Sequence, residues 1–196
     1  MVNKILFHSI RFKKTMRLLN SFFLLTLMSF PMLSPAQDKD EELLAWSATK
    51  KLAWSDYKGK PDTGSDAAAT TSTYLGFEYA IRNNKFSYQI DCMFSKNKSW
   101  GRAKTEYILS HEQGHFDIAE IFARKLNKKM TEYLYNKKNY REELDKIYND
   151  IIEEKEIFQT EYDKVTDYSR NMDIQAVWLK KIEGLLKEFK NYSVYN

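Results

Sequence analysis

The spacing of apolar residues divides the chain into an alternating part followed by a part with helical periodicity. Residues 67–82 alternate in part, and residues 86–94 alternate well, between apolar and polar side chains, and Asn83 and Asn84 separate the two stretches. Alternation of this length around turn-forming asparagines predicts a β-hairpin. Shorter apolar runs earlier in the chain predict two further short strands, at residues 43–46 and 52–54.

Beyond Gly101 the apolar positions recur every three or four residues, which is the spacing of a buried helix face. This pattern predicts helices over residues 103–136 and 141–163, then a loop, then a last helix whose apolar stripe runs from Ile174 to Phe189. Strands that precede a run of helices favour an α+β fold. We therefore expect a small antiparallel N-terminal sheet followed by about three helices.

Five residues in the first predicted helix, His111-Glu112-Gln113-Gly114-His115, read H-E-x-x-H. In this signature of zinc proteases the two histidines bind the metal and the glutamate acts on a water molecule. Histidines at positions i and i+4 stand one above the other on the same helix face, as metal binding requires. The plainer interpretation is a pair of ordinary histidines on a buried face, with Glu112 paired to a basic residue.

The helical wheel of the same segment separates a buried face from an exposed one. Phe122 and Leu126 fall within about 60° of His111, so the histidines and the glutamate are expected to point into the protein. Four charged residues fall between about 180° and 260° and are predicted to face solvent. They are Asp117, Glu120, Arg124 and Lys128.

A catalytic zinc site uses three protein ligands, so the two histidines need a partner from elsewhere in the chain. The remaining histidine, His8, lies in an N-terminal segment that we expect to be removed, which leaves Asp, Glu, Tyr or solvent. Glu120 lies about 140° from His115 on the same helix and points away from it. The other candidates are Asp167 and Tyr168 in the late loop and, on the second helix, Glu153, Glu154 and Glu156.

Residues 1–36 are predicted to be a signal peptide, with Met16 as an alternative start. A basic beginning is followed by a mostly apolar stretch, and Ser34 and Ala36 suit positions −3 and −1 of a cleavage site. The apolar stretch is short for a membrane span, which favours cleavage over a retained anchor. We expect an exported protein, periplasmic or secreted, with one domain over residues 37–196 and no stable membrane insertion after cleavage.

Removal of this segment changes the charge argument. The full chain carries 31 Lys+Arg and 27 Asp+Glu, a net charge of +4. Five of the basic residues and none of the acidic ones lie in residues 1–36, which leaves 26 basic and 27 acidic residues, a net charge of −1. Nucleic acid is therefore not an expected partner. The single cysteine, Cys92, excludes an internal disulfide and is expected to be a small buried apolar residue.

Several blocks of the sequence together resemble one bacterial family. They are residues 52–61 (LAWSDYKGKP), Ser99-Trp100, residues 109–120 (LSHEQGHFDIAE), Tyr162-Asp163, Gln175 and Trp178. The family is a secreted one known as domain of unknown function family 922, whose members are described as predicted zinc-dependent proteases. The resemblance covers nearly all of the mature chain and implies zinc as the cofactor and a protease fold.

One position departs from the family pattern. Where the family typically shows Thr-x-His-Gly in the late loop, this chain has Thr166-Asp167-Tyr168-Ser169. If that family histidine is the third ligand, Tyr168 replaces it here. A phenol binds zinc less readily at neutral pH, because its pKa is about 10.

The sequence thus predicts an exported zinc metallopeptidase of the H-E-x-x-H type that acts on peptides or proteins. His111 and His115 would hold the metal with Tyr168 or Asp167, and Glu112 would take a proton from the metal-activated water and pass it to the leaving amine. The hairpin could offer an edge for an extended peptide. The alternative is a catalytically silent metal-binding or interaction protein of the same fold, with its third ligand lost at Tyr168.

Overall fold

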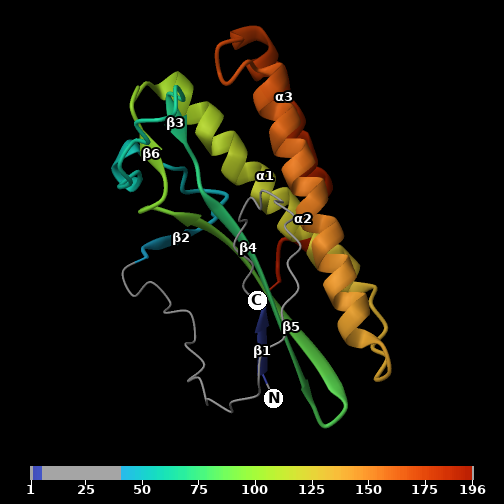
Figure 1. Ribbon diagram of the computed structural model, residues 1–196. Coiled ribbons are helices and arrows are strands. Elements are labelled where there is room, and N and C mark those ends of the chain that lie inside the picture. The colour runs from blue at the N-terminus through green and yellow to red at the C-terminus, as the bar shows by residue number, and fades with distance from the viewer. Residues whose placement is uncertain (1, 6–40, 196) are drawn as a thin grey trace, which may run out of the picture.

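A computed structural model describes residues 2–5 and 41–195 and shows an antiparallel sheet beside three helices, an α+β fold as predicted (Figure 1). The main sheet has the strand order β1-β4-β5-β2, and β3 and β6 form a separate two-stranded sheet. The strands are β1 (Val2–Ile5), β2 (Leu43–Ala45), β3 (Ala69–Thr70), β4 (Thr73–Arg82), β5 (Lys85–Ser95) and β6 (Trp100–Gly101). The helices are α1 (Glu106–Thr131), α2 (Tyr140–Val165) and α3 (Met172–Glu188), with 3-10 turns η1 (Trp54–Asp56) and η2 (Lys190–Tyr192).

The predicted hairpin is confirmed as β4 and β5, which pair from Thr73 opposite Phe94 to Arg82 opposite Lys85. Asn83 and Asn84 form the turn with φ values of 51° and 60°. Asparagine tolerates this left-handed region better than most residues, which is why the dipeptide marks the reversal. The strand at residues 43–46 is confirmed as β2, which pairs with the far side of β5.

The predicted strand at residues 52–54 is wrong. The backbone amide of Leu52 donates to the side chain of Gln113 at 2.8 Å, and the chain then enters the 3-10 turn η1. The turn is closed by Asp56, whose carboxylate accepts from the backbone amide of Ala53 at 3.0 Å. Apolar residues at this position pack on the metal-motif helix rather than in a sheet, and periodicity over three residues cannot separate the two cases.

Helix α1 is the central element of the fold. It packs against both strands of the hairpin and against α2 and α3, and its C-terminal half also meets the last turn η2 (Figure 1). The fully buried core residues come from all of these layers, and Cys92 is buried among them as expected. Examples of this core are Phe94, Ile118, Phe122, Leu126, Leu144, Tyr162 and Ile182.

The prediction that four charged residues of α1 face solvent is wrong for three of them. Asp117, Glu120 and Arg124 have exposed fractions of 9%, 1% and 5%, and Lys128 is half-buried. The reason is that further chain covers this face: Asp117 accepts from the indole of Trp46 at 2.7 Å, and Glu120 accepts from the hydroxyl of Tyr195 at 2.6 Å. A helix enclosed on all sides carries its charges inside in paired form.

The N-terminal part of the chain contributes one edge strand. Strand β1 pairs antiparallel with β4, Val2 opposite Ala80 and Ile5 opposite Phe77. The rest of the predicted signal peptide lies outside the described residues. Within the described part of the chain, no helix is long and apolar enough to cross a membrane.

Candidate metal centre

The metal motif lies near the N-terminus of α1, one turn after the helix begins. Thr105 caps the helix by accepting a hydrogen bond from the amide of Ile108 at 3.2 Å, and Glu106 places a favourable negative charge in the first turn. His111 and His115 follow one turn apart, with ring centroids 5.0 Å from each other. Both side chains are buried, as the helical wheel predicted.

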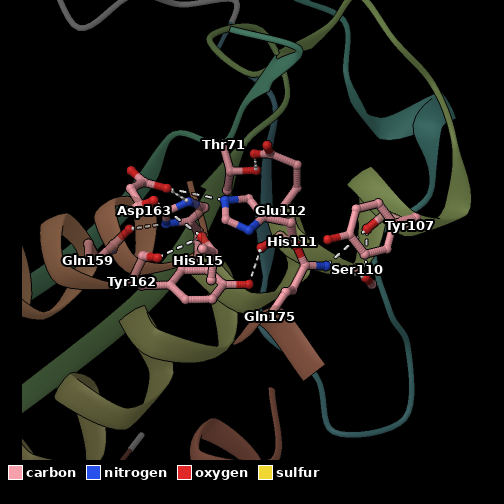
Figure 2. A network of polar contacts seen from close by, with 11 residues as sticks. Thr71, Tyr107, Ser110, His111, Glu112, His115, Gln159, Tyr162, Asp163 and Gln175 are labelled. Carbon is pink, nitrogen blue, oxygen red and sulfur yellow. Dashed lines mark hydrogen bonds and ion pairs between the residues drawn. The ribbon is translucent and has the colours of Figure 1, made fainter. Parts of the chain in front are cut away.

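A carboxylate from α2 meets both imidazoles. Asp163 Oδ1 lies 3.1 Å from His111 Nε2 and 2.9 Å from His115 Nε2 (Figure 2). One ligand atom from each of the three residues lies within 4.8 Å of the other two, so His111, His115 and Asp163 form a group that could hold a metal ion. Two imidazole nitrogens and one carboxylate oxygen are a donor set that catalytic zinc sites use.

Gln159 fixes the orientation of one of the two rings. Its side-chain oxygen lies 2.6 Å from His115 Nδ1, one helical turn before Asp163 on α2 (Figure 2). An amide oxygen only accepts hydrogen bonds, so Nδ1 donates to Gln159, and Nε2 is the nitrogen that faces Asp163 and that would bind a metal after losing its proton. Hydrogen-bond partners on the ring nitrogen that does not face the metal orient metal-binding histidines in this way.

Tyr162 brings α2 against α1 at the motif. Its ring stacks on His111 with centroids 4.5 Å apart, and it meets His115 edge-on at 5.1 Å. Its hydroxyl donates to the backbone carbonyl of His111 at 3.3 Å. Burial, with the nearby charges of Glu112 and Asp163, raises the pKa of Tyr162 well above its usual range, so it stays a neutral donor.

Glu112 is buried beside this group, with 4% of its surface exposed. Its Oε2 accepts a hydrogen bond from the hydroxyl of Thr71 at 2.7 Å. The plainer interpretation required a basic partner for this glutamate, and the described residues give it a hydroxyl instead. The hydroxyl of Thr71 thus satisfies one oxygen of this buried side chain, as a buried polar group requires.

Two of the three candidate ligands, Asp163 and His115, have pKa values shifted by their neighbours. Burial would raise the pKa of Asp163, but hydrogen bonds and charge from His111 and His115 hold it well below its usual range. Burial would lower the pKa of His115, but its bonds to Asp163 and Gln159 and the charge of Glu112 raise it above the ordinary 6.5. Without a metal, the group therefore behaves as a buried ion pair.

The sequence-predicted residues His111, His115 and Glu112 lie together, and the carboxylate that joins the two histidines is Asp163, which is not among the predicted third ligands. Asp167 has a side chain 63% exposed and pairs with Arg170 at 3.6 Å. Neither it nor Glu153, Glu154 or Glu156 belongs to the cluster found among the described residues. Tyr168 is 60% exposed in the same turn, and its role as a ligand stays a prediction.

Sequence reasoning passed over Asp163 because it ends the predicted second helix. One signal pointed to it. Gln159 and Asp163 are four residues apart, so they share a helix face and can serve the same partner. Tyr162-Asp163 is also one of the blocks that carry the family resemblance, whereas the predicted ligands lie in the acidic run before it and in the loop after it.

A model of bacterial proteins of unknown function, DUF922, matches residues 32–170. The chain belongs to this family. The matched range includes β2 to β6, α1 and α2, and so every residue of the candidate metal centre, whereas α3 lies beyond it. The DUF922 assignment agrees with the resemblance seen in the sequence and by itself states no activity. No curated protein and no solved structure matches the chain.

Proposed function

We propose that this protein is an exported, zinc-dependent metallopeptidase. The observation that carries the proposal is the convergence of His111 Nε2, His115 Nε2 and Asp163 Oδ1 at one point, with Glu112 next to His111 in the same helix turn. Membership in a family without an assigned activity is compatible with this and does not decide it.

The donor set favours zinc over harder cations. Magnesium and calcium take mainly oxygen ligands, whereas two imidazoles with one carboxylate suit zinc in a four-coordinate site that keeps one position open. Gln159 and Tyr162 hold His115 and His111 in place, which prepares the site before metal arrives. Bound zinc supplies Lewis acidity, which polarises a carbonyl and makes water nucleophilic near neutral pH.

Glu112 is the proposed general base. Its carboxylate lies on the α1 face next to the histidines and is held by Thr71 through Oε2 only, which leaves Oε1 without a partner among the described residues. Oε1 can take a proton from the attacking water and return it to the leaving amine. His111, His115 and Asp163 would bind the metal through deprotonated atoms, so they would take no part in the proton transfer.

The substrate class is a peptide or protein, and its sequence preference is open. Part of each outer edge of the hairpin has a partner in the described structure: β1 along residues 77–80 of β4, the hydroxyl of Tyr148 on the carbonyl of Leu75 at 2.7 Å, and β2 along residues 93–95 of β5. Strand β1 lies in the segment that is proposed to be removed on export, so the mature protein would lose this partner of β4. Binding of an extended peptide along that edge stays a prediction.

The silent-protein alternative depended on loss of the third ligand at position 168. Asp163 supplies a carboxylate beside both histidines, so a ligand at Tyr168 is not needed to complete three protein donors. This favours the active interpretation. Export is supported by the basic beginning and the apolar stretch of residues 1–36. Apart from β1, this segment lies outside the described residues.

The test is metal content and peptide cleavage measured on the same preparations. Purified protein should retain about one zinc per chain and cleave members of a mixed peptide library, and His111→Ala should lose both properties. Glu112→Gln should keep zinc and lose roughly 10²-fold or more in rate. A zinc-loaded parent that cleaves no peptide, or a Glu112→Gln variant as active as the parent, would show the proposal to be wrong.

A further inference from the structure

We propose that Thr71 and Tyr57 are positioning residues that hold the general base Glu112 through a chain of two hydroxyl groups. The Thr71 hydroxyl oxygen lies 2.7 Å from Glu112 Oε2 and 2.8 Å from the Tyr57 hydroxyl oxygen. The inference rests on the proposed function, because it assigns these residues to the same reaction.

The direction of both hydrogen bonds follows from counting protons. A carboxylate only accepts hydrogen bonds, so Thr71 donates its single hydroxyl proton to Glu112. The bond between Tyr57 and Thr71 must then be donated by Tyr57. Burial raises the pKa of Tyr57 well above its usual range, which keeps its proton available for this bond. The chain therefore runs from Tyr57 through Thr71 to Glu112 and ends on the carboxylate.

The hydroxyl of Thr71 is fixed by the connection between β3 and β4. The next amide, that of Ser72, donates to the side-chain oxygen of Ser99 at 2.9 Å, and the carbonyl of Ser72 accepts from the amide of Ser95 at 2.9 Å. Ser99 is fully buried, so this part of the chain is anchored on both sides of the backbone. Thr71 thus approaches Glu112 from a rigid element rather than from a free loop.

The ring of Tyr57 is held just as firmly. It is 5% exposed and lies between Trp54 and Phe94, with ring centroids 4.9 Å and 5.1 Å away. The following residues are tied to the turn after β5, where the amide of Gly59 donates to the carbonyl of Ser99 at 2.8 Å. The same buried serine therefore supports both hydroxyl donors.

This arrangement suits a base that must be aimed. A glutamate side chain has several rotatable bonds, and fixing one oxygen leaves the other to face the water it deprotonates. A neutral hydroxyl donor holds the carboxylate without neutralising it, whereas a lysine or arginine in the same place would form an ion pair. The neighbouring ligands His111 and His115 have partners of their own, so the chain acts on Glu112 alone.

Three variants separate the hydroxyl from the bulk of the side chain. Thr71→Val keeps the shape and removes the donor, Thr71→Ser keeps the donor and removes a methyl group, and Tyr57→Phe removes the outer link of the chain. Zinc-loaded full-length protein should show a kcat at least roughly tenfold lower for Thr71→Val with little change in KM, and near-parental values for Thr71→Ser. Tyr57→Phe should fall between them, and zinc content should not change.

Binding of acetohydroxamic acid gives a readout that needs no peptide cleavage. A hydroxamic acid that chelates zinc would release a proton, and Glu112 is the carboxylate placed to accept it, so the affinity would report on the placement of Glu112. Calorimetric titration should show weaker binding for Thr71→Val and Glu112→Gln than for the parent and Thr71→Ser. If the parent binds the hydroxamate but cleaves no peptide, the proposed function fails while this comparison still tests Thr71.

A double variant tests whether Thr71 acts through Glu112. If Thr71 acts through Glu112, then adding Thr71→Val to Glu112→Gln should change neither kcat nor hydroxamate affinity further, although each change is harmful alone. The inference is overturned if Thr71→Val matches the parent in both measurements. It is also overturned if Thr71→Ser is as impaired as Thr71→Val, because the methyl group and not the hydroxyl would then matter.

Discussion

The hydroxyl oxygen of Tyr162 lies 2.6 Å from the place that a β-carbon on residue 114 would occupy. Gly114 therefore has a packing reason to be glycine, since a real β-carbon almost never comes so close to another heavy atom. The close approach lets α2 lay Tyr162 across the two histidine rings and delivers the next residue, Asp163, to their Nε2 atoms. A glycine inside the motif thus determines the distance between the two helices that share the candidate ligands.

Gly114→Ala should destabilise the protein and weaken metal binding. Alanine favours a helix over glycine by about 1 kcal/mol, but forcing an extra carbon into a packed site costs about 1–3 kcal/mol. Tyr162 is fully buried, and its ring packs against the rings of His111 and His115, so the side chain cannot simply turn away. Chemical unfolding and zinc retention measure the two effects.

Gly184→Ala is the matched control for this change. Gly184 also lies inside a helix, α3, but apart from its chain neighbours and the nearby backbone of α3, no atom of the described residues is within 4 Å of the place that a β-carbon there would occupy. The same substitution there should raise the free energy of unfolding by about 0.5–1 kcal/mol. Equal effects at the two positions would contradict the packing account.

Asp163→Asn should lower zinc affinity by roughly tenfold or more, because a neutral amide replaces a charged ligand. The control variants are Asp167→Asn and Tyr168→Phe, which alter exposed side chains in the following turn and should change affinity less than about twofold. Competition with a colorimetric zinc chelator measures all three. A large loss in Tyr168→Phe would restore Tyr168 as a ligand, and an unaffected Asp163→Asn would remove Asp163 from the site.

The parts of the site that are local in sequence could be predicted, and the parts that depend on tertiary contact could not. The spacing of His111 and His115 defines their shared face through helix geometry alone. Asp163 is 48 residues beyond His115, and only the packing of α2 on α1 shows which of several acidic residues arrives. Thr71 gave no sequence signal, because a lone threonine between short strands has many ordinary roles.

The hairpin was predictable for the same local reason, since alternation and two asparagines determine its register. The face of α1 that carries Glu120 and Arg124 was not. A helical wheel assumes one buried side, whereas α1 is covered by the hairpin, two helices and the C-terminal turn. Residues 52–61 are one of the blocks that carry the family resemblance, and the structure ties them to the motif through the hydrogen bond from the Leu52 amide to Gln113.

The metal-free protein should lose stability as pH rises through neutrality. The pKa of His115 is raised above 6.5, so its contribution is complete below that value and disappears as pH passes the raised one. The pKa of Asp163 is lowered below 3.8, so its contribution holds above 3.8 and is lost only in stronger acid. Unfolding in the presence of a chelator at several pH values measures this slope, and Asp163→Asn should flatten it.

Saturating zinc should reverse the sign of that slope. Metal binding requires a neutral imidazole, so protons compete with zinc and the stabilisation it gives grows as pH rises. The same unfolding series with and without zinc therefore gives two lines of opposite slope above about pH 6.5, where the metal-free protein loses the contribution of His115. Parallel lines would mean that zinc binds elsewhere or not at all.

The buried pair on α1 provides the last prediction. Arg124 Nε lies 2.8 Å from Glu120 Oε1, and the two side chains are 7% and 1% exposed. Tyr195 donates to the same carboxylate, and Arg124 also donates to the carbonyl of Leu186 at 2.6 Å. Glu120→Ala would leave a buried guanidinium without its counter-charge, which should cost about 3–5 kcal/mol of unfolding free energy.

An exposed pair with the same spacing separates burial from mere charge pairing. Lys146 and Asp150 are also four residues apart on a helix, at 2.7 Å, with side chains 74% and 54% exposed. Asp150→Ala should cost about 0.5 kcal/mol or less, because water screens such pairs. Chemical denaturation of both variants gives the comparison. Glu120 does not belong to the group of candidate metal ligands, so a Glu120→Ala variant that still folds should keep its zinc. If both variants lose a similarly small amount of unfolding free energy, this face of α1 is open to solvent.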